Sequence, residues 1–175
     1  MAFLDPRITL SPLGLSSGMK VADIGAGSGA YALAAAEAVG DMGLVYAIEV
    51  QKELLSKLKR EAERRGKHSI HVVWADAEKP GSTGLNDKSA DAAIFSNVLF
   101  QMEHKDGALE EVKRVLVPKG RVLVVDWAES GGLGPAPEHL FGKSAARALF
   151  EKHGFSFRTE ARAGDHHYAL VFQKS

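Results

Sequence analysis

A glycine-rich segment, VADIGAGSGAY at residues 21–31, is the part of the sequence whose residue types and spacing most clearly suggest chemistry. It leaves an apolar run and opens a helical pattern. Glycines in such a segment allow positive φ and let a ligand approach the backbone closely. The N-terminus of the helix that follows favours a carboxylate or a phosphate. The segment therefore predicts a ligand-binding loop between a strand and a helix.

Asp23 helps to separate two classes of ligand for this loop. The spacing Gly25-x-Gly27-x-x-Ala30 also satisfies a relaxed dinucleotide fingerprint, so the glycines alone decide little. Asp23, however, is expected at the end of a central strand, where a carboxylate is costly unless it is hydrogen-bonded. The N–H groups of the loop or an ammonium group on the ligand would satisfy it, whereas a dinucleotide offers no cation. Asp23 therefore tips the balance toward a ligand that carries an ammonium group.

Strand-like and helical patterns alternate along the chain around this loop. Largely apolar runs at Val21–Ile24, Val45–Ile48 and Val122–Val125 are typical of parallel strands that are covered on both faces. The alternation indicates βαβ units, a parallel sheet and right-handed crossovers. Strands are expected at Lys20–Ile24, Leu44–Glu49, Ile70–Ala75, Ala90–Ser96 and Arg121–Trp127, and helices at Gly29–Val39, Gln51–Arg65 and Lys105–Val115.

Two local features of this part of the chain carry finer expectations. The second helix is expected to bury Leu54, Leu58 and Ala62 on one face, with its charges on the other. The stretch Val117–Gly120 is expected to be the turn that leads into the fifth strand. Before the first strand, residues 5–18 contain proline and serine and are expected to hold a short helix.

The C-terminal part changes this rhythm. A helix expected at Lys143–His153 ends at Gly154, a residue type that commonly terminates helices. Strand-like runs follow at Phe155–Ala161 and His167–Gln173. The segment between these runs is too short for a crossover helix, so the last two strands are expected to form an antiparallel hairpin.

Composition excludes several classes of function. The 175 residues fit one domain and include 22 Lys and Arg against 22 Asp and Glu, which gives no support for a nucleic-acid or membrane partner. Because the chain has no cysteine, a disulfide scaffold, a thiolate zinc site, an iron–sulfur cluster and a cysteine nucleophile are excluded. No targeting segment is visible and no apolar stretch approaches the roughly 20 residues that span a bilayer. A cytoplasmic protein is therefore the default expectation.

The glycine-rich segment resembles motif I of the class I S-adenosylmethionine-dependent methyltransferases. Within that superfamily the chain is similar to small methyltransferase-domain proteins of the ubiquinone/menaquinone-biosynthesis (UbiE-like) type, over about Leu10 to Gln173. The resemblance implies a Rossmann-like α/β fold with a seven-stranded, mostly parallel sheet in the order 3-2-1-4-5-7-6, a C-terminal antiparallel hairpin and helices on both faces. It also implies a single methyltransferase domain, with residues 1–18 as a short extension or lid and 19–175 as the catalytic core.

The resemblance assigns cofactor-binding roles to the ends of four strands. Glu49 stands where an acid can accept hydrogen bonds from both ribose hydroxyls, a role shared with dinucleotide enzymes. Asp76 would accept from the adenine amino group, and Ser96 and Asn97 would bind the ammonium or carboxylate of the methionine part. Bland alternatives are a helix-capping acid at Glu49 and an ordinary loop aspartate at Asp76. The expected S-adenosylmethionine-binding residues are Asp23, Gly25, Gly27, Gly29, Glu49, Val50, Asp76, Ala77, Ser96 and Asn97.

The methyl acceptor is expected beyond the same strand ends, next to residues 126–129, 131–139 and 165–168. Methyl transfer requires alignment of the nucleophile and, for an O–H or acidic C–H acceptor, a base, for which histidine suits neutral pH. One of His166 and His167 is expected to point outward, since neighbours in a strand face opposite sides. No tight HxH or HExxH arrangement supports a metal. The acceptor-side candidates are Asn97, Trp127, His139 and His167.

Three functions remain open at this point. The first is methyl transfer from S-adenosylmethionine to a small-molecule acceptor, favoured because the Asn-Pro-Pro-aromatic motif of enzymes that methylate nucleic-acid or glutamine nitrogens is absent. The second is a non-catalytic module that binds S-adenosylmethionine or S-adenosylhomocysteine, and the third is an NAD(P)-dependent oxidoreductase. The short lid implies an open site, a bulky or protein-bound acceptor, or a lid supplied by a partner subunit, as in a homodimer.

Overall fold

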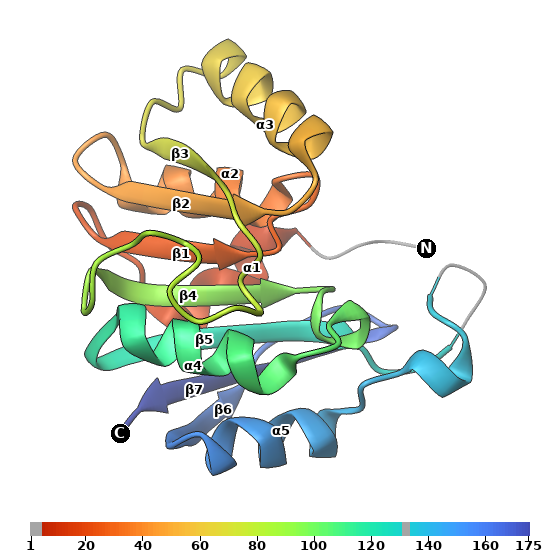
Figure 1. The fold of residues 1–175 in the computed structure, drawn as a ribbon. Coiled ribbons are helices and arrows are strands. Elements are labelled where there is room, and N and C mark those ends of the chain that lie inside the picture. The colour runs from red at the N-terminus through yellow and green to blue at the C-terminus, as the bar shows by residue number, and fades with distance from the viewer. Residues whose placement is uncertain (1–4, 131–133) are drawn as a thin grey trace.

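The computed structural model describes residues 5–130 and 134–175, which form one seven-stranded sheet with helices on both faces (Figure 1). The strands are β1 Lys20–Ile24, β2 Leu44–Glu49, β3 Ile70–Trp74, β4 Ala90–Ser96, β5 Leu116–Trp127, β6 Phe155–Glu160 and β7 His167–Lys174. The helices are α1 Pro6–Leu10, α2 Ala30–Val39, α3 Lys52–Arg64, α4 Lys105–Val115 and α5 Lys143–Lys152, with 3₁₀ turns η1 Ser11–Leu13, η2 Leu99–Gln101 and η3 Pro137–His139.

The strand order is β3-β2-β1-β4-β5-β7-β6, which confirms the expected topology. Strands β1 to β5 are mutually parallel, and β7 runs antiparallel between β5 and β6. The order reverses between β1 and β4, and in open α/β sheets ligands bind at such a switch point, outside the carboxyl ends of the strands. The topology alone therefore places a site next to the loop that follows β1.

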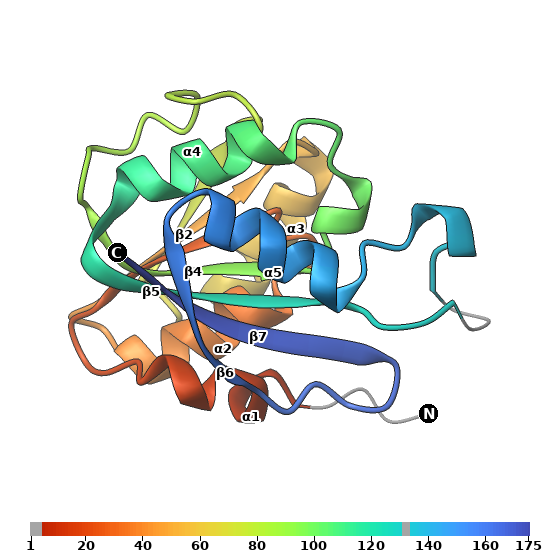
Figure 2. The same ribbon diagram turned by 90° about the horizontal axis from the view of Figure 1, so that it is seen from below.

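Two apolar layers sandwich the sheet, because successive side chains of a strand point to opposite faces. Helices α1, α2 and α3 cover one face, where Val21 and Leu123 are buried. Helices α4 and α5 cover the other face, where Ala22 and Val122 are buried (Figure 2). Both faces of the sheet are thus buried from solvent, which explains the continuous apolar runs of the central strands. In the described part of the chain, no helix is long and apolar enough to cross a membrane.

The structure corrects three local expectations. Val117–Gly120 is not a separate turn: β5 already starts at Leu116, and the register shift between the Ala90 and Ala92 pairings with β5 absorbs these residues as an irregularity. In α3, Leu55 rather than Leu54 joins Leu58 and Ala62 in the buried set. Strand β3 ends at Trp74, so Asp76 lies in the loop after the strand and not at its last position.

Candidate functional site

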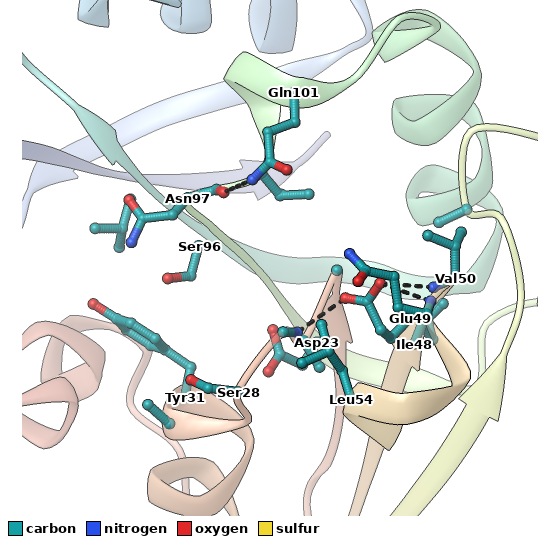
Figure 3. Close-up of a pocket in the computed structure, with 18 of the residues that line it drawn as sticks. Asp23, Ser28, Tyr31, Ile48, Glu49, Val50, Leu54, Ser96, Asn97 and Gln101 are labelled. Carbon is teal, nitrogen blue, oxygen red and sulfur yellow. Dashed lines mark hydrogen bonds between the residues drawn. The ribbon is translucent and has the colours of Figure 1, made fainter. Parts of the chain in front are cut away.

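A cavity of about 690 Å³ opens at the carboxyl ends of the central strands. Its walls come from the loop after β1, the end of β2, the segment after β3, the end of β4 and the start of β7 (Figure 3). Nine of the ten expected cofactor-binding residues line this cavity. The exception is Gly29.

Gly25, Gly27 and Gly29, in the loop after β1, all have positive φ, but their surroundings differ. A Cβ on Gly25 would lie 2.5 Å from Val98 Cγ2, and one on Gly29 would lie 2.2 Å from Leu58 Cδ1. At Gly27 the nearest atom would be 3.8 Å away, so this glycine faces open space in the cavity. Gly29 therefore serves helix packing against α3, whereas Gly27 keeps the backbone accessible to a ligand.

Glu49 holds the glycine loop against the end of β2. Its Oε2 accepts a hydrogen bond from the Gly27 amide at 3.0 Å, and its Oε1 accepts from the amides of Val50 at 2.9 Å and Gln51 at 3.1 Å. An ionised carboxylate offers about four lone-pair sites, so one remains for a ligand hydroxyl. The side chain is only 7% exposed but lines the cavity. It is both a brace of the loop and a candidate ligand-binding acid.

Asp23 is a buried carboxylate at the end of β1, with 1% of its surface exposed. Within the described residues, neither of its oxygens has a hydrogen-bond partner, and the residue lines the cavity. Burial raises its pKa to about 7, with a smaller contribution in the same direction from the charge of Glu49. The amide of Ala32 opposes the shift without reaching hydrogen-bonding geometry. A group left this way is satisfied by a proton or by a ligand that donates hydrogen bonds.

Asn97 presents a second unsatisfied acceptor to the same space. It has φ of 53°, a left-handed conformation that asparagine tolerates better than most residues. Its backbone N–H donates to Val125 O at 2.8 Å, and its backbone carbonyl accepts from Gln101 Nε2 at 2.8 Å. Its buried Oδ1 has no partner among the described atoms. Figure 3 shows Asp23, Ser96 and Asn97 around one space, with the Tyr31 hydroxyl directed toward it.

The far end of the cavity is formed by the turn after β2 and the loop after β3. Val50 is half exposed, and its carbonyl accepts a hydrogen bond from Trp74 Nε1 at 2.9 Å. Asp76 Oδ1 accepts from the Glu78 amide at 3.1 Å, while its Oδ2 lies 3.1 Å from Lys79 Nζ. Ala77 is buried and lines the wall. These residues lie where the resemblance expects adenine and ribose.

The candidate residues for the acceptor side are divided by the structure. His167 lines the cavity, and its ring packs against that of Trp127, with centroids 4.2 Å apart and the two planes tilted by 36°. Burial lowers the pKa of His167, and the charge of His166 adds to this, so the ring is held neutral at pH 7. His166 instead places Nδ1 2.7 Å from Glu129 Oε1. The expectation that one of the two histidines points elsewhere is thus met.

Trp127 and His139 do not line the cavity. Trp127 reaches it only through the ring of His167, while His139 lies exposed in η3. The part of the acceptor segment at residues 131–133 lies outside the described residues. Among the residues that are described, no group of three or more His, Asp or Glu side chains is arranged to hold a metal.

Several lining residues were missed by the sequence reasoning. Tyr31 and Gln101 lie inside segments already singled out, and their polar ends were the signal that could have found them. Asp5, Pro6 and Ala163 come from segments far away in the sequence and carry no local motif. The missed lining residues include Asp5, Pro6, Tyr31, Ile48, Gln51, Leu54, Ala75, Glu78, Gln101, Val125 and Ala163.

The charge of the cavity contrasts with that of the chain. Five carboxylates line it, from Asp5, Asp23, Glu49, Asp76 and Glu78, whereas no lysine or arginine does so within residues 5–130 and 134–175. The remaining stretches, residues 1–4 and 131–133, contain no lysine or arginine in their sequence. A dinucleotide would bring at least two phosphate charges next to these five carboxylates, with only the backbone N–H groups of the glycine loop to meet them. The site therefore disfavours the oxidoreductase alternative.

Comparisons with known proteins agree on one family. The family described as "Methyltransferase domain" matches residues 15–167. The chain is 30% identical over 145 residues to the aklanonic acid methyltransferase DauC of Streptomyces sp. (strain C5), covering 83% of this chain and 64% of that protein. It is 35% identical over 123 residues to the ubiquinone/menaquinone biosynthesis C-methyltransferase UbiE of Laribacter hongkongensis (strain HLHK9), covering 70% of this chain and 49% of that protein. The chain thus spans about half to two-thirds of the length of these relatives.

A solved structure extends the agreement to the fold. The crystal structure of a SAM dependent methyltransferase from Aquifex aeolicus superposes with a TM-score of 0.89 at 27% identity, covering 98% of this chain and 90% of that one. The similarity therefore includes the C-terminal hairpin and the short N-terminal helix, and not only the glycine loop.

Proposed function

Because the chain belongs to the methyltransferase domain family, we propose that it transfers a methyl group from S-adenosylmethionine to a small-molecule acceptor by direct displacement. The observation that carries this proposal is the buried Asp23 carboxylate, which lacks a hydrogen-bond partner among the described residues and lies beside the cavity with the unpartnered Asn97 Oδ1. Two such acceptors call for a ligand that donates hydrogen bonds and carries positive charge. The ammonium group of S-adenosylmethionine has both properties.

The residues present fit this cofactor along the whole cavity. Asp23 and Asn97, with Ser96 and Tyr31 beside them, would hold the methionine part, and the bare backbone at Gly27 would lie against it. The free lone-pair site of Glu49 would take a ribose hydroxyl. The adenine would lie between the Val50 side and the loop of Asp76 and Ala77. When bound, S-adenosylmethionine supplies a methyl group already activated by its sulfonium, so the protein needs no covalent nucleophile.

His167 is the residue that we propose takes the proton of the acceptor. Support comes from its place in the cavity wall and from the burial that keeps its ring neutral. Trp127 is a positioning residue in this proposal, because its indole packs against the ring of His167. The exposed position of His139 makes it the weaker candidate for a base. Val125 and Met102 line the neighbouring wall and would help to exclude water.

The alternative that remains is a module that binds S-adenosylmethionine or S-adenosylhomocysteine without catalysis. Binding and turnover therefore have to be measured separately. Calorimetry with S-adenosylmethionine and with NADH should give binding of the first alone; binding of NADH alone would overturn the proposal. Incubation with methyl-labelled S-adenosylmethionine and a small-metabolite extract should give a labelled product. Tight cofactor binding without any labelled product would favour the binding module.

The proposal also holds that the methyl acceptor is a small molecule and not a nucleic acid. It is supported by the equal numbers of basic and acidic residues in the chain and by the acidic lining of the cavity. A cytoplasmic location and a homodimer that completes the lid stay expectations, to be checked by fractionation of cells and by light scattering of the purified protein.

A further inference from the structure

The part of the cavity around Asp23 and Asn97, which we call the methionine end, contains two kinds of polar group. The Asp23 carboxylate and Asn97 Oδ1 are hydrogen-bond acceptors without a partner among the described residues. The side chains of Ser28, Tyr31 and Ser96 line the same cavity and carry hydroxyls, which can donate. The amino-acid part of S-adenosylmethionine has an ammonium group that donates and a carboxylate that accepts. The proposed function uses Asp23 and Asn97 for the ammonium group and leaves the carboxylate without a donor.

Tyr31 is the hydroxyl-bearing residue whose position suits a carboxylate best. It stands in the first turn of α2, and Figure 3 shows its hydroxyl directed toward the space around Ser96 and Asn97. No side chain caps the N-terminus of α2, and its first turn contains no acid. The positive end of the helix dipole therefore favours a negative group at this edge of the cavity. The carboxylate of the cofactor is a negative group that the proposed ligand itself brings there.

The surroundings of Tyr31 keep its hydroxyl protonated. Burial has the largest influence on the pKa of Tyr31 and raises it above its ordinary value. The Thr9 hydroxyl lowers the pKa in part without reaching hydrogen-bonding geometry, the charge of Asp23 raises it, and the Ser96 hydroxyl lowers it. A phenol that keeps its proton at neutral pH is a hydrogen-bond donor. It is a stronger donor than a serine hydroxyl, because its proton is more acidic.

Refining the proposed methyl transfer, on which this inference rests, we propose that the Tyr31 hydroxyl binds the carboxylate of S-adenosylmethionine. Asp23 and Tyr31 then bind the two charged groups of the same amino acid, and the chain distinguishes ligands that carry this carboxylate from ligands that lack it. The sulfonium and the ammonium group of the cofactor enter together with the carboxylate. The wall therefore has to supply hydrogen-bond donors for the carboxylate and not a lysine or arginine. Tyr31 is a binding residue in this proposal and takes no part in the transfer of the methyl group.

A thermodynamic cycle between one hydroxyl and one carboxylate tests the proposal. Tyr31→Phe removes the hydroxyl and keeps the ring, while decarboxylated S-adenosylmethionine lacks the carboxylate and keeps the sulfonium and the ammonium group. Calorimetry gives the affinity of both ligands for both proteins. We expect Tyr31→Phe to weaken S-adenosylmethionine about tenfold or more and to leave the decarboxylated ligand unchanged. An equal loss for the two ligands, or no loss for S-adenosylmethionine, would overturn the proposal.

The quantity to compare is the change in the ratio of the two affinities. The decarboxylated ligand carries one more net positive charge, so the acidic cavity attracts it in the wild type and in the variant alike. This attraction cancels when the ratio of the variant is divided by that of the wild type. Unchanged binding of the decarboxylated ligand also shows that Tyr31→Phe is folded, so a lost contact is separated from a lost structure.

Three further variants locate the effect. Tyr46→Phe removes the same hydroxyl from β2, where Tyr46 does not line the cavity and its ring centroid lies 6.4 Å from that of His71, so the ratio should not change. Asp23→Asn should weaken both ligands, because both carry the ammonium group. Ser96→Ala should change the ratio less than Tyr31→Phe does. A larger change in Ser96→Ala would make Ser96 the donor to the carboxylate and overturn the proposal for Tyr31.

The titration of the wild type with S-adenosylmethionine separates this inference from the proposed function. If the wild type binds S-adenosylmethionine but the ratio is the same in Tyr31→Phe, only the role of Tyr31 fails. If the wild type does not bind S-adenosylmethionine, the proposed function fails and the role of Tyr31 fails with it.

Discussion

The Glu49 carboxylate accepts a hydrogen bond from the Gly27 amide at 3.0 Å, which ties the end of β2 to the glycine loop after β1. The two residues are 22 positions apart in the sequence. The other carboxylate oxygen binds two amides of the turn that starts α3. One acid therefore sets the distance between two walls of the cavity, so loop geometry and ligand binding are coupled through it.

Replacing Glu49 with glutamine should reduce both stability and cofactor affinity. The amide nitrogen of glutamine cannot accept from a backbone N–H, so at least one of the three hydrogen bonds is lost. We expect a decrease of about 1–3 kcal/mol in the free energy of unfolding, measured by urea denaturation. Affinity for S-adenosylmethionine, measured by calorimetry, should also fall. Glu53→Gln on the exposed first turn of α3 is the matched control and should change neither quantity.

Asp23 should make cofactor binding depend on pH. Because burial raises its pKa to about 7, the carboxylate is largely protonated at pH 6 and ionised at pH 8. The ionised form is the one that attracts an ammonium group. We therefore expect the increase in melting temperature caused by S-adenosylmethionine to be larger at pH 8 than at pH 6. An increase that does not change over this range would contradict the assignment of Asp23.

The stability of the ligand-free protein should show the opposite dependence. The folded chain keeps a proton on Asp23 that the unfolded chain releases above its ordinary pKa of 3.8, so this residue lowers stability as the pH rises from there to about 7. Asp23→Asn should remove that loss and be more stable than the wild type at pH 8. It should also bind S-adenosylmethionine more weakly by about 1.5–3 kcal/mol. Asp41→Asn, at an exposed loop position, is the control.

Two glycine substitutions should separate packing from binding. In Gly29→Ala the new methyl group would overlap Leu58, and the backbone has φ of 84°, so we expect a loss of about 2–4 kcal/mol in stability. Gly27→Ala has room for its methyl group and should lose only about 1–2 kcal/mol from its positive φ. Its main defect should be in S-adenosylmethionine affinity, because the added group enters the cavity. Urea denaturation and calorimetry on both variants check this separation. If the loss of S-adenosylmethionine affinity were proportional to the loss of stability in the two variants, the prediction would be contradicted.

His167→Gln should reduce turnover by about 10²- to 10⁴-fold once an acceptor is found, with little change in S-adenosylmethionine affinity. Because burial lowers the pKa of His167, wild-type activity at saturating S-adenosylmethionine should persist below pH 6.5 and fall when the ring becomes protonated. That acidic limb should vanish in the variant. His166→Gln removes a histidine that faces Glu129 and should keep the rate, while the acidic limb should move to slightly higher pH because the charge of His166 helps to lower the pKa of His167. Equal losses in the two variants would count against His167 as the base.

The sequence by itself determined the positions of the sheet strands and of the glycine loop. Strands covered on both faces are continuously apolar, and a tight turn from a strand into a helix requires glycines. Both features can therefore be recognised from residues that are adjacent in the sequence. The resemblance to a known family then singled out Asp23, Glu49, Asp76 and Asn97, at or just after strand ends. Each of these residues lines the cavity.

The tertiary structure alone decided how those residues divide their tasks. In the structure Gly29 packs against Leu58, and Glu49 accepts hydrogen bonds from three backbone amides. The Asp23 carboxylate has no hydrogen-bond partner among the described residues. It also turned His167 rather than His166 toward the cavity. These outcomes depend on strand register and on contacts between segments far apart in the chain. Local sequence patterns carry no record of either, because a side chain's direction and partners are set only when the sheet and its helices have packed.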